Sequence, residues 1–208
     1  MLRVGLTGGI ASGKTTVTGM MRALGCVVIE LDPIAHALME PGHAAYEQIC
    51  KEFGAEILDS ERRIDRSKLG PLVFADPAKL QRLNQITHPP VLQVVDNWFE
   101  SLAESGAAEM GVVEAALLVE AGYHQKLDRL VVAWCRPEQQ LERLLARGLS
   151  REAAQQRIVA QMPADEKRKL ATDVIDCSGS IEQTQQQIEK VVATLRQLAG
   201  ATAAPAKT

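Results

Sequence analysis

The chain has 208 residues, of which 46% are hydrophobic and 24% charged, a length that suits one domain with inserted pieces. Its formal net charge of −3 and aromatic content of 3% argue against a general nucleic-acid binder. No apolar run reaches the roughly 20 residues that a membrane span needs, and the N-terminus lacks signal-peptide features. The 4 cysteines lie singly, without metal-ligand or redox spacing. We therefore predict a cytoplasmic globular protein with buried thiols and neither membrane nor nucleic-acid partners.

Short apolar runs alternate with longer helical patterns along the chain. This alternation is typical of a parallel sheet with helices on both faces, whose strands are apolar almost throughout. Most of the runs contain the β-branched residues that buried strands favour. We therefore predict a doubly wound α/β fold with a five-stranded parallel sheet. The predicted strands are Leu2–Thr7, Cys26–Glu30, Gly111–Glu114, Arg129–Trp134 and Val174–Asp176.

The segment after the first predicted strand carries the most specific motif. Gly8–Thr15 reads GGIASGKT and fits the phosphate-loop pattern G-x-x-x-x-G-K-[ST], with the helical pattern Thr16–Leu24 after it. Backbone N–H groups of such a loop and the N-terminus of the next helix bind a polyphosphate. Lys14 is expected to reach the β- and γ-phosphates, and the Thr15 hydroxyl to ligate Mg²⁺. The predicted nucleotide-binding residues are Gly9, Ile10, Ala11, Ser12, Gly13, Lys14, Thr15 and Thr16.

Acidic residues lie at the ends of the second and third predicted strands. Ligands of a doubly wound sheet bind beyond the carboxyl ends of its strands, so Asp32 is expected in the crevice of the phosphate loop. There it would orient an attacking hydroxyl and accept its proton. The alternative is a helix N-cap, since Pro33 suits a first helical turn. Glu114 would hold Mg²⁺ through water.

Residues 33–104 are too many for one crossover helix, and they predict a helical subdomain beside the sheet. Its longest pattern is expected to be interrupted at His88, because Pro89 and Pro90 remove backbone donors. His88 then has a default structural role at a helix break. The helical patterns are Ala35–Glu40, Ala44–Phe53, Ser67–Phe74 and Ala78–Leu102.

Residues 137–170 form a second predicted helical insertion. Between Arg136 and Lys169 the chain carries eight basic and five acidic residues. Arg143 and Arg147 are four apart on one helix face, so a closing lid would bring them to the transferring phosphoryl group; the alternative is a solvated face. The core then comprises residues 1–32, 105–136 and 171–200, ending in the helix Ile181–Leu198, with 201–208 a disordered tail.

The chain lacks the N/T-K-x-D motif that a regulatory GTPase needs to recognise guanine. Small size, two helical insertions and an arginine-rich segment instead favour a small-molecule kinase whose lid closes over the phosphates. Two alternatives stay open: a kinase acting on another small hydroxyl or a nucleoside monophosphate, and a nucleotide-gated binding protein without transfer activity.

The chain resembles the bacterial dephospho-CoA kinase family over nearly its whole length. The order of the matching stretches makes the resemblance specific, whereas the phosphate loop alone would not. They are GLTGGIASGKTT at 5–16, VVIELDPIAHALMEPG at 27–42, LNQITHPPV at 83–91, ALLVEAG at 116–122, QQLERLLAR at 139–147 and RIVAQMPADEKRKLATDVIDCSG at 157–179.

The resemblance implies Mg²⁺- and ATP-dependent phosphorylation of the ribose 3′-hydroxyl of dephospho-CoA, the last step of coenzyme A synthesis. It implies Asp32 as the base, Lys14 in the phosphate site, and Arg143 and Arg147 as lid arginines. A monomer or weak homo-oligomer is expected. The implied substrate-binding residues are Asp32, His88, Leu117, Leu118 and Glu120.

Some positions depart from the family's pattern. Cys177 replaces an asparagine near the expected adenine pocket, so a side-chain hydrogen bond to the base is in doubt. Ala11 replaces a common loop glycine. The other departures are Glu30 and Glu114 for aspartate, Ala116 for proline and His36 for arginine.

Overall fold

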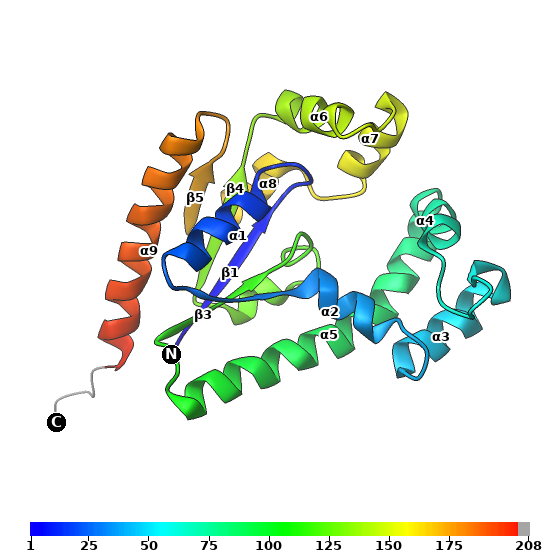
Figure 1. Ribbon diagram of the computed structural model, residues 1–208, viewed down its shortest axis with the longest axis horizontal. Helices are drawn as coiled ribbons and strands as arrows, with labels where there is room; N and C mark the ends of the chain where they lie inside the picture. The colour runs from blue at the N-terminus through cyan, green and yellow to red at the C-terminus, as the bar shows by residue number, and fades with distance from the viewer. Residues whose placement is uncertain (204–208) are drawn as a thin grey trace. The chain divides into compact units, whose positions relative to one another are not determined.

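The computed structural model describes residues 1–203. The chain divides into two compact units, one built from Met1–Ile29 with the chain from Trp98 onward, the other from Glu30–Asn97. The second unit corresponds to the predicted helical insertion 33–104, but it begins three residues earlier and ends seven residues earlier in the chain. Figure 1 shows the sheet of the first unit and the helices of the second.

The first unit contains a five-stranded sheet in the order β2-β3-β1-β4-β5. The central strand β1 pairs in parallel with β3 and β4, and β4 pairs in parallel with β5. All five predicted strands and the doubly wound fold class are confirmed, with boundaries that shift by at most one residue. The strands are β1 (Leu2–Gly8), β2 (Val27–Glu30), β3 (Met110–Glu114), β4 (Arg129–Trp134) and β5 (Asp173–Asp176).

Helices cover both faces of the sheet, which explains why its central strands are apolar almost throughout. On one face, α1 (Lys14–Ala23) and α9 (Ile181–Ala203) pack on the sheet in a core that includes Val131. On the other face, Leu130 and Val132 of β4 pack in a separate core with Val119 and Met162. Neighbouring residues of β4 thus enter opposite cores.

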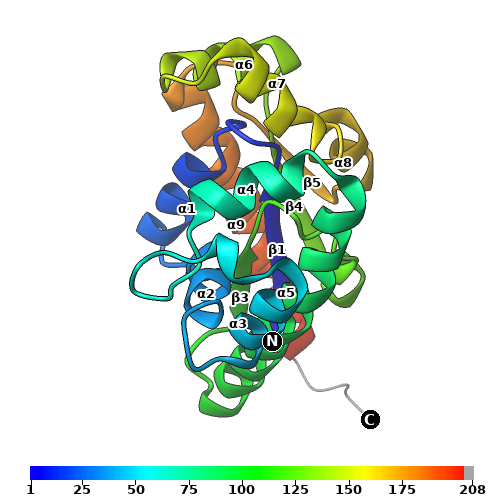
Figure 2. The same cartoon turned by 90° about the vertical axis from the view of Figure 1, so that its right-hand side faces the viewer.

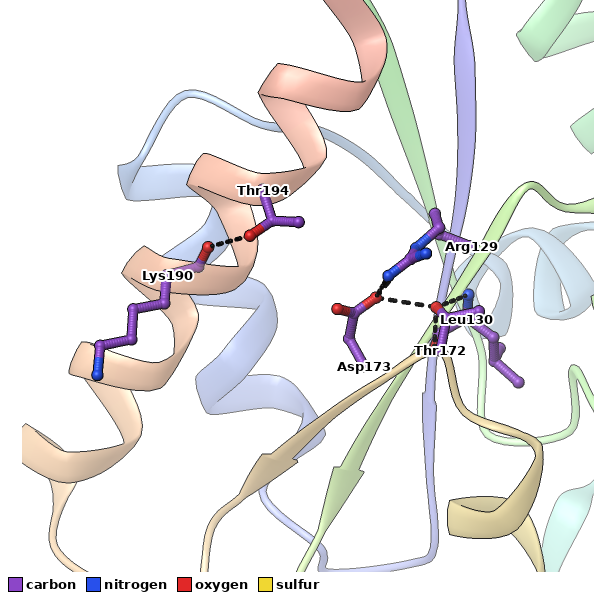
Figure 3. Close-up of polar contacts among 6 residues, drawn as sticks. All are labelled: Arg129, Leu130, Thr172, Asp173, Lys190 and Thr194. Carbon is purple, nitrogen blue, oxygen red and sulfur yellow. Dashed lines mark hydrogen bonds and ion pairs between the residues drawn. The ribbon is translucent and has the colours of Figure 1, made fainter.

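The edge strand β5 is held to β4 by side-chain contacts (Figure 3). The Arg129 guanidinium donates to Asp173 Oδ2 through Nη2 at 2.8 Å and Nε at 3.2 Å. The Leu130 N–H donates to the Thr172 hydroxyl at 2.9 Å. These contacts fix the register of β5, and therefore the place of Cys177 just beyond its end.

The second unit is helical and has its own small core. Ile49, Phe53, Ile57, Leu69 and Val73 are buried in that core. Its helices are α2 (Leu31–Leu38), α3 (Ala44–Phe53), the 3-10 turn η1 (Ala55–Ile57), α4 (Arg66–Phe74) and α5 (Pro77–Ser105), the last continuing into the first unit. Figure 2 shows these helices from a second direction.

The predicted break at His88 is wrong, because α5 runs continuously through Pro89 and Pro90. Two prolines remove two backbone donors and usually kink or end a helix. Here large apolar residues are buried on both sides of the pair, with Ile86 at 5% and Val95 at 0% exposure. Burying such a side chain is worth about 1.5–3 kcal/mol, so packing offsets the lost hydrogen bonds. His88 is therefore a half-buried residue inside a helix.

The arginine-rich segment is helical as predicted and belongs to the first unit. It forms α6 (Pro137–Ala146), α7 (Arg151–Val159) and α8 (Ala164–Leu170). Outside this segment, the short 3-10 turn η2 (Tyr123–Lys126) lies just before β4. None of the helices in residues 1–203 has the length and apolar character needed to cross a membrane.

The last helix continues beyond its predicted end at Leu198 to Ala203. Ala199 is buried at 1% exposure, and alanine is the strongest helix former. Residues 201–203 of the predicted disordered tail are therefore helical, while 204–208 lie outside the described residues.

Candidate functional site

The phosphate loop occupies residues 9–13, between the end of β1 and the start of α1. Gly13 is the N-cap of α1 and has φ of 106°, a left-handed conformation that side chains rarely adopt. Ala11 has φ of 58°, also in the left-handed region. The loop thus holds a non-glycine residue in a conformation that costs about 1–2 kcal/mol.

Several polar groups of the loop are available to an anion. Within the described chain, α1 has no side-chain N-cap and no acidic residue in its first turn. The Ser12 hydroxyl is buried, and no hydrogen-bond partner for it lies in residues 1–203. Thr15 and Thr16 are exposed on the first turn. A helix N-terminus without a side-chain cap, together with a buried, unsatisfied hydroxyl, fits a phosphate ligand.

Lys14 forms an ion pair with Glu114. Glu114 is the last residue of β3 and lies opposite Leu6 of β1 in the sheet register. The side chains of Lys14 and Glu114 are only 14% and 5% exposed. Glu114 therefore lies beside Lys14, at the strand end where sequence reasoning placed it. Its contact with Mg²⁺ through water stays a prediction.

Three residues of the arginine-rich segment contact the loop backbone. Gln140 Nε2 donates to the carbonyl of Ile10, and the Ile10 N–H donates to Gln161 Oε1. Arg143 donates to the carbonyl of Ala11 at 3.0 Å. Sequence reasoning missed both glutamines, although each lies in a stretch that resembles the family.

The two predicted lid arginines have different surroundings. Arg143 Nη2 also donates to the carbonyl of Cys177 at 2.7 Å, so its guanidinium joins the phosphate loop to the end of β5. Arg147 is exposed and is the C-cap of α6, one residue beyond the helix. Contact of either arginine with a transferring phosphoryl group stays a prediction.

The segment after β3 contains three of the predicted substrate-binding residues. Leu118 is 1% exposed and belongs to the protein interior, whereas Leu117 is half-buried. Glu120 Oε1 accepts the Lys167 ammonium at 2.8 Å and the Met162 N–H at 3.0 Å. Glu120 thus connects this segment to α8, and its part in substrate binding stays a prediction.

Lys167 was not singled out from the sequence. Its side chain is 0% exposed, and besides Glu120 it donates to the carbonyl of Ala116 at 2.6 Å. In the sequence it lies within the charged run DEKRK at 165–169, which looks like a solvated face. Only the phase of the helix separates it from its exposed neighbours.

Asp32 lies in the second unit, in the first turn of α2. The helix begins at Leu31 and its N-cap is Glu30, so the alternative assignment of Asp32 as the N-cap is wrong. Its carboxylate is exposed and lies just beyond the end of β2.

The Cys177 thiol is buried beside the phosphate loop. Burial raises its pKa from the usual 9.0 to about 11, and the neighbouring Cys135 contributes in the same direction. The folded chain thus holds this proton more tightly than the unfolded chain. The stability that the thiol contributes is present below pH 9 and is lost as the pH rises through about 11.

We therefore expect the stability difference between the wild type and Cys177→Ala to shrink between pH 8 and pH 11. Urea unfolding at several pH values measures both free energies of unfolding, and the variant controls for lysine and tyrosine titration in the same range. A constant difference across this range would contradict the assignment.

The fold and the loop define a class: a P-loop phosphotransferase with helical insertions. The dephospho-CoA kinase family model matches residues 2–183, and the chain belongs to this family. It phosphorylates dephospho-CoA to coenzyme A with ATP, which sets aside the binding protein without transfer activity and the kinase of another acceptor.

Individual relatives support the same assignment. The chain is 47% identical to the dephospho-CoA kinase of Carboxydothermus hydrogenoformans over 186 residues, covering 89% of this chain and 90% of the relative. It is 43% identical to the Aquifex aeolicus dephospho-CoA kinase over 191 residues, covering 92% and 96%. A solved Thermus thermophilus structure superposes with a TM-score of 0.78 at 35% identity, covering 93% and 97%. The Campylobacter jejuni dephospho-CoA kinase gives 0.68 at 29% identity, covering 94% and 97%.

Proposed function

We propose that this chain transfers the γ-phosphoryl group of ATP directly to the ribose 3′-hydroxyl of dephospho-CoA, with Asp32 as the base. The single observation that supports the phosphate side most strongly is the loop of residues 9–13. This loop has a left-handed glycine and a buried Ser12 hydroxyl with no hydrogen-bond partner in residues 1–203, and Lys14, directly after it, pairs with Glu114. Chemistry in such a site is largely positioning and charge stabilisation.

Lys14 binds the triphosphate in this proposal. Its ammonium is paired with Glu114, and both side chains are nearly buried. Triphosphate oxygens offer a second set of negative partners at the same point. Lys14 would then neutralise charge on the β- and γ-phosphates, while Glu114 keeps the ammonium oriented from the end of β3.

The residues present also fit Mg²⁺. No group of three His, Cys, Asp or Glu side chains that could hold a metal ion occurs within residues 1–203. Mg²⁺ bound with nucleotides needs no such group, because phosphates and water supply most ligands. Thr15, exposed at the start of α1, would provide the hydroxyl ligand, and Glu114 would act through water. When bound, the ion would neutralise charge on the phosphates.

Asp32 would accept the acceptor's proton. The 3′-oxygen forms a bond to the γ-phosphorus as the bond to the β–γ bridging oxygen breaks, and the hydroxyl proton passes to the Asp32 carboxylate. ADP leaves with the bridging oxygen. Asp32 is exposed in the first turn of α2, so its carboxylate is accessible to an acceptor hydroxyl.

We expect Asp32→Asn to lower kcat by about 10²–10⁴-fold with little change in ATP affinity, because an amide cannot accept the proton. The measurement is coupled ADP release with dephospho-CoA as acceptor, with and without Mg²⁺, alongside direct ATP titration. Glu104→Gln, which removes an exposed carboxylate from α5, is the control. Wild-type turnover in Asp32→Asn would show that the base assignment is wrong.

A further inference from the structure

We propose that Gln140 and Gln161 are positioning residues that hold the backbone of Ile10 and so preorganise the phosphate loop for ATP. The inference deepens the proposed role of this loop and rests on it. Gln140 lies in the first turn of α6, and Gln161 lies two residues after the end of α7. The α6–α7 segment would then hold the loop in place, a role we call the brace, as well as act as a lid.

The two glutamines contact the same residue from both sides of its backbone. Gln140 Nε2 donates to the Ile10 carbonyl at 2.7 Å, and Gln161 Oε1 accepts the Ile10 N–H at 2.8 Å. Both distances are typical of well-formed hydrogen bonds. Toward Ile10, Gln140 is the donor and Gln161 is the acceptor. The backbone of Ile10 is therefore held at both its C=O and its N–H.

The next residue along the loop is also held from α6. Arg143 donates to the Ala11 carbonyl at 3.0 Å, and Ala11 has the unfavourable φ of 58°. A left-handed non-glycine residue persists where its surroundings determine it. The hydrogen bonds to Ile10 and Ala11 hold the backbone in this conformation.

Burial makes the Gln140 contact costly to lose. Gln140 is 4% exposed, so its amide has little access to water as a substitute partner. A loop that is ordered before ATP arrives does not lose that conformational freedom on binding. We therefore expect the brace to act on ATP affinity more than on the transfer step.

The first test is the pair of variants Gln140→Ala and Gln161→Ala. We expect each to raise the ATP Kd and KM by about tenfold, since one hydrogen bond is worth about 1–1.5 kcal/mol, and to change kcat at saturating ATP less than about threefold. Gln155→Ala, an exposed glutamine on α7, is the matched control and should bind ATP as the wild type does. An unchanged Kd in both variants would overturn the proposal.

A second pair of variants separates hydrogen bonding from charge. Gln161→Glu keeps an acceptor for the Ile10 N–H, whereas Gln140→Glu places an acceptor against the Ile10 carbonyl. Both add one negative charge beside the same residue. We expect the ATP Kd of Gln140→Glu to rise at least about tenfold more than that of Gln161→Glu. Equal effects would mean that only charge matters and would overturn the proposal.

Gly9 provides a third test, because a substitution there moves the Gln140 side chain without replacing it. A Cβ at Gly9 would lie 2.4 Å from Gln140 Nε2, with no atom outside this side chain nearer than Ala164 Cβ at 3.8 Å. Gly9→Ala should therefore displace the Gln140 amide. We expect Gly9→Ala, Gln140→Ala and the double variant to have the same ATP Kd within about twofold. Additive effects would overturn the proposal.

These outcomes are distinguishable from failure of the proposed function. A wild-type protein that binds no ATP would refute the role of the loop itself. A wild type that binds and phosphorylates normally, with all three glutamine tests negative, would refute only the brace. Thermal unfolding of each variant without nucleotide shows that a changed Kd comes from folded protein.

Discussion

Replacing Gly13 with alanine is expected to lower ATP affinity by about 100-fold or more and to reduce stability. The φ of 106° at Gly13 strains any residue with a side chain, at a cost of about 1–3 kcal/mol. A Cβ there would also lie 2.9 Å from Cys177 Cβ and 3.0 Å from Cys177 Sγ. The two costs act together, and the loop has to move away from its phosphate-binding shape to relieve them. ATP titration and thermal unfolding measure both effects.

Gly19 gives the matched control for this change, because it lies on the same helix, α1. Apart from its chain neighbours and the backbone of its own helix, no heavy atom of the described chain lies within 4 Å of a Cβ at Gly19, and its φ is not positive. Gly19→Ala is therefore expected to stabilise the protein by about 1 kcal/mol and to leave ATP affinity unchanged. If Gly13→Ala bound ATP like Gly19→Ala, the left-handed cap would not be essential.

The sheet was predictable because its strands are buried on both faces. Residues such as Val131 and Val132 enter different cores, and both must be apolar. The continuity of the helices in the second unit was harder to predict. The sequence around Pro89 predicts a break by local chemistry, but the burial of Ile86 and Val95 keeps α5 continuous. Local rules fail there because tertiary packing contributes more free energy.

The phosphate loop was predictable because its backbone requires particular residues at a fixed spacing. The residues that hold the loop were not. A glutamine that donates to a carbonyl, as Gln140 does, satisfies no side-chain pattern, and its partner Ile10 is 130 positions away. Gln161 poses the same difficulty. Such contacts follow from the path of the α6–α7 segment, and composition and periodicity do not specify that path.

Lys167 illustrates a different limit. Charge runs usually form solvated faces, and Lys169 and Glu166 of the same helix form an exposed ion pair at 2.7 Å. On α8, however, Ala164 and Lys167 face inward, with exposures of 8% and 0%. The buried ammonium is tolerated because Glu120 and the Ala116 carbonyl both accept from it.

The second large effect is a loss of folding stability, expected when Glu120 is removed from this buried ion pair. Glu120→Ala leaves the Lys167 ammonium fully buried with only the Ala116 carbonyl, and a buried charge without its partner costs about 3–5 kcal/mol. Lys167→Met instead removes the buried charge and fills similar volume. Its cost is smaller, about 1–2 kcal/mol, because Glu120 is 21% exposed to water and keeps the Met162 N–H.

The order of these effects tests desolvation against simple loss of a contact. If loss of the contact were the whole effect, the two single variants would be equally destabilised. Desolvation predicts that Glu120→Ala is the less stable, and that adding Lys167→Met to it recovers about 1.5 kcal/mol or more, since the lone buried charge is gone. Urea unfolding gives each free energy, provided the slopes agree. Lys169→Met, at the exposed pair on the same helix, should show no measurable change. A double variant less stable than Glu120→Ala would contradict the desolvation argument.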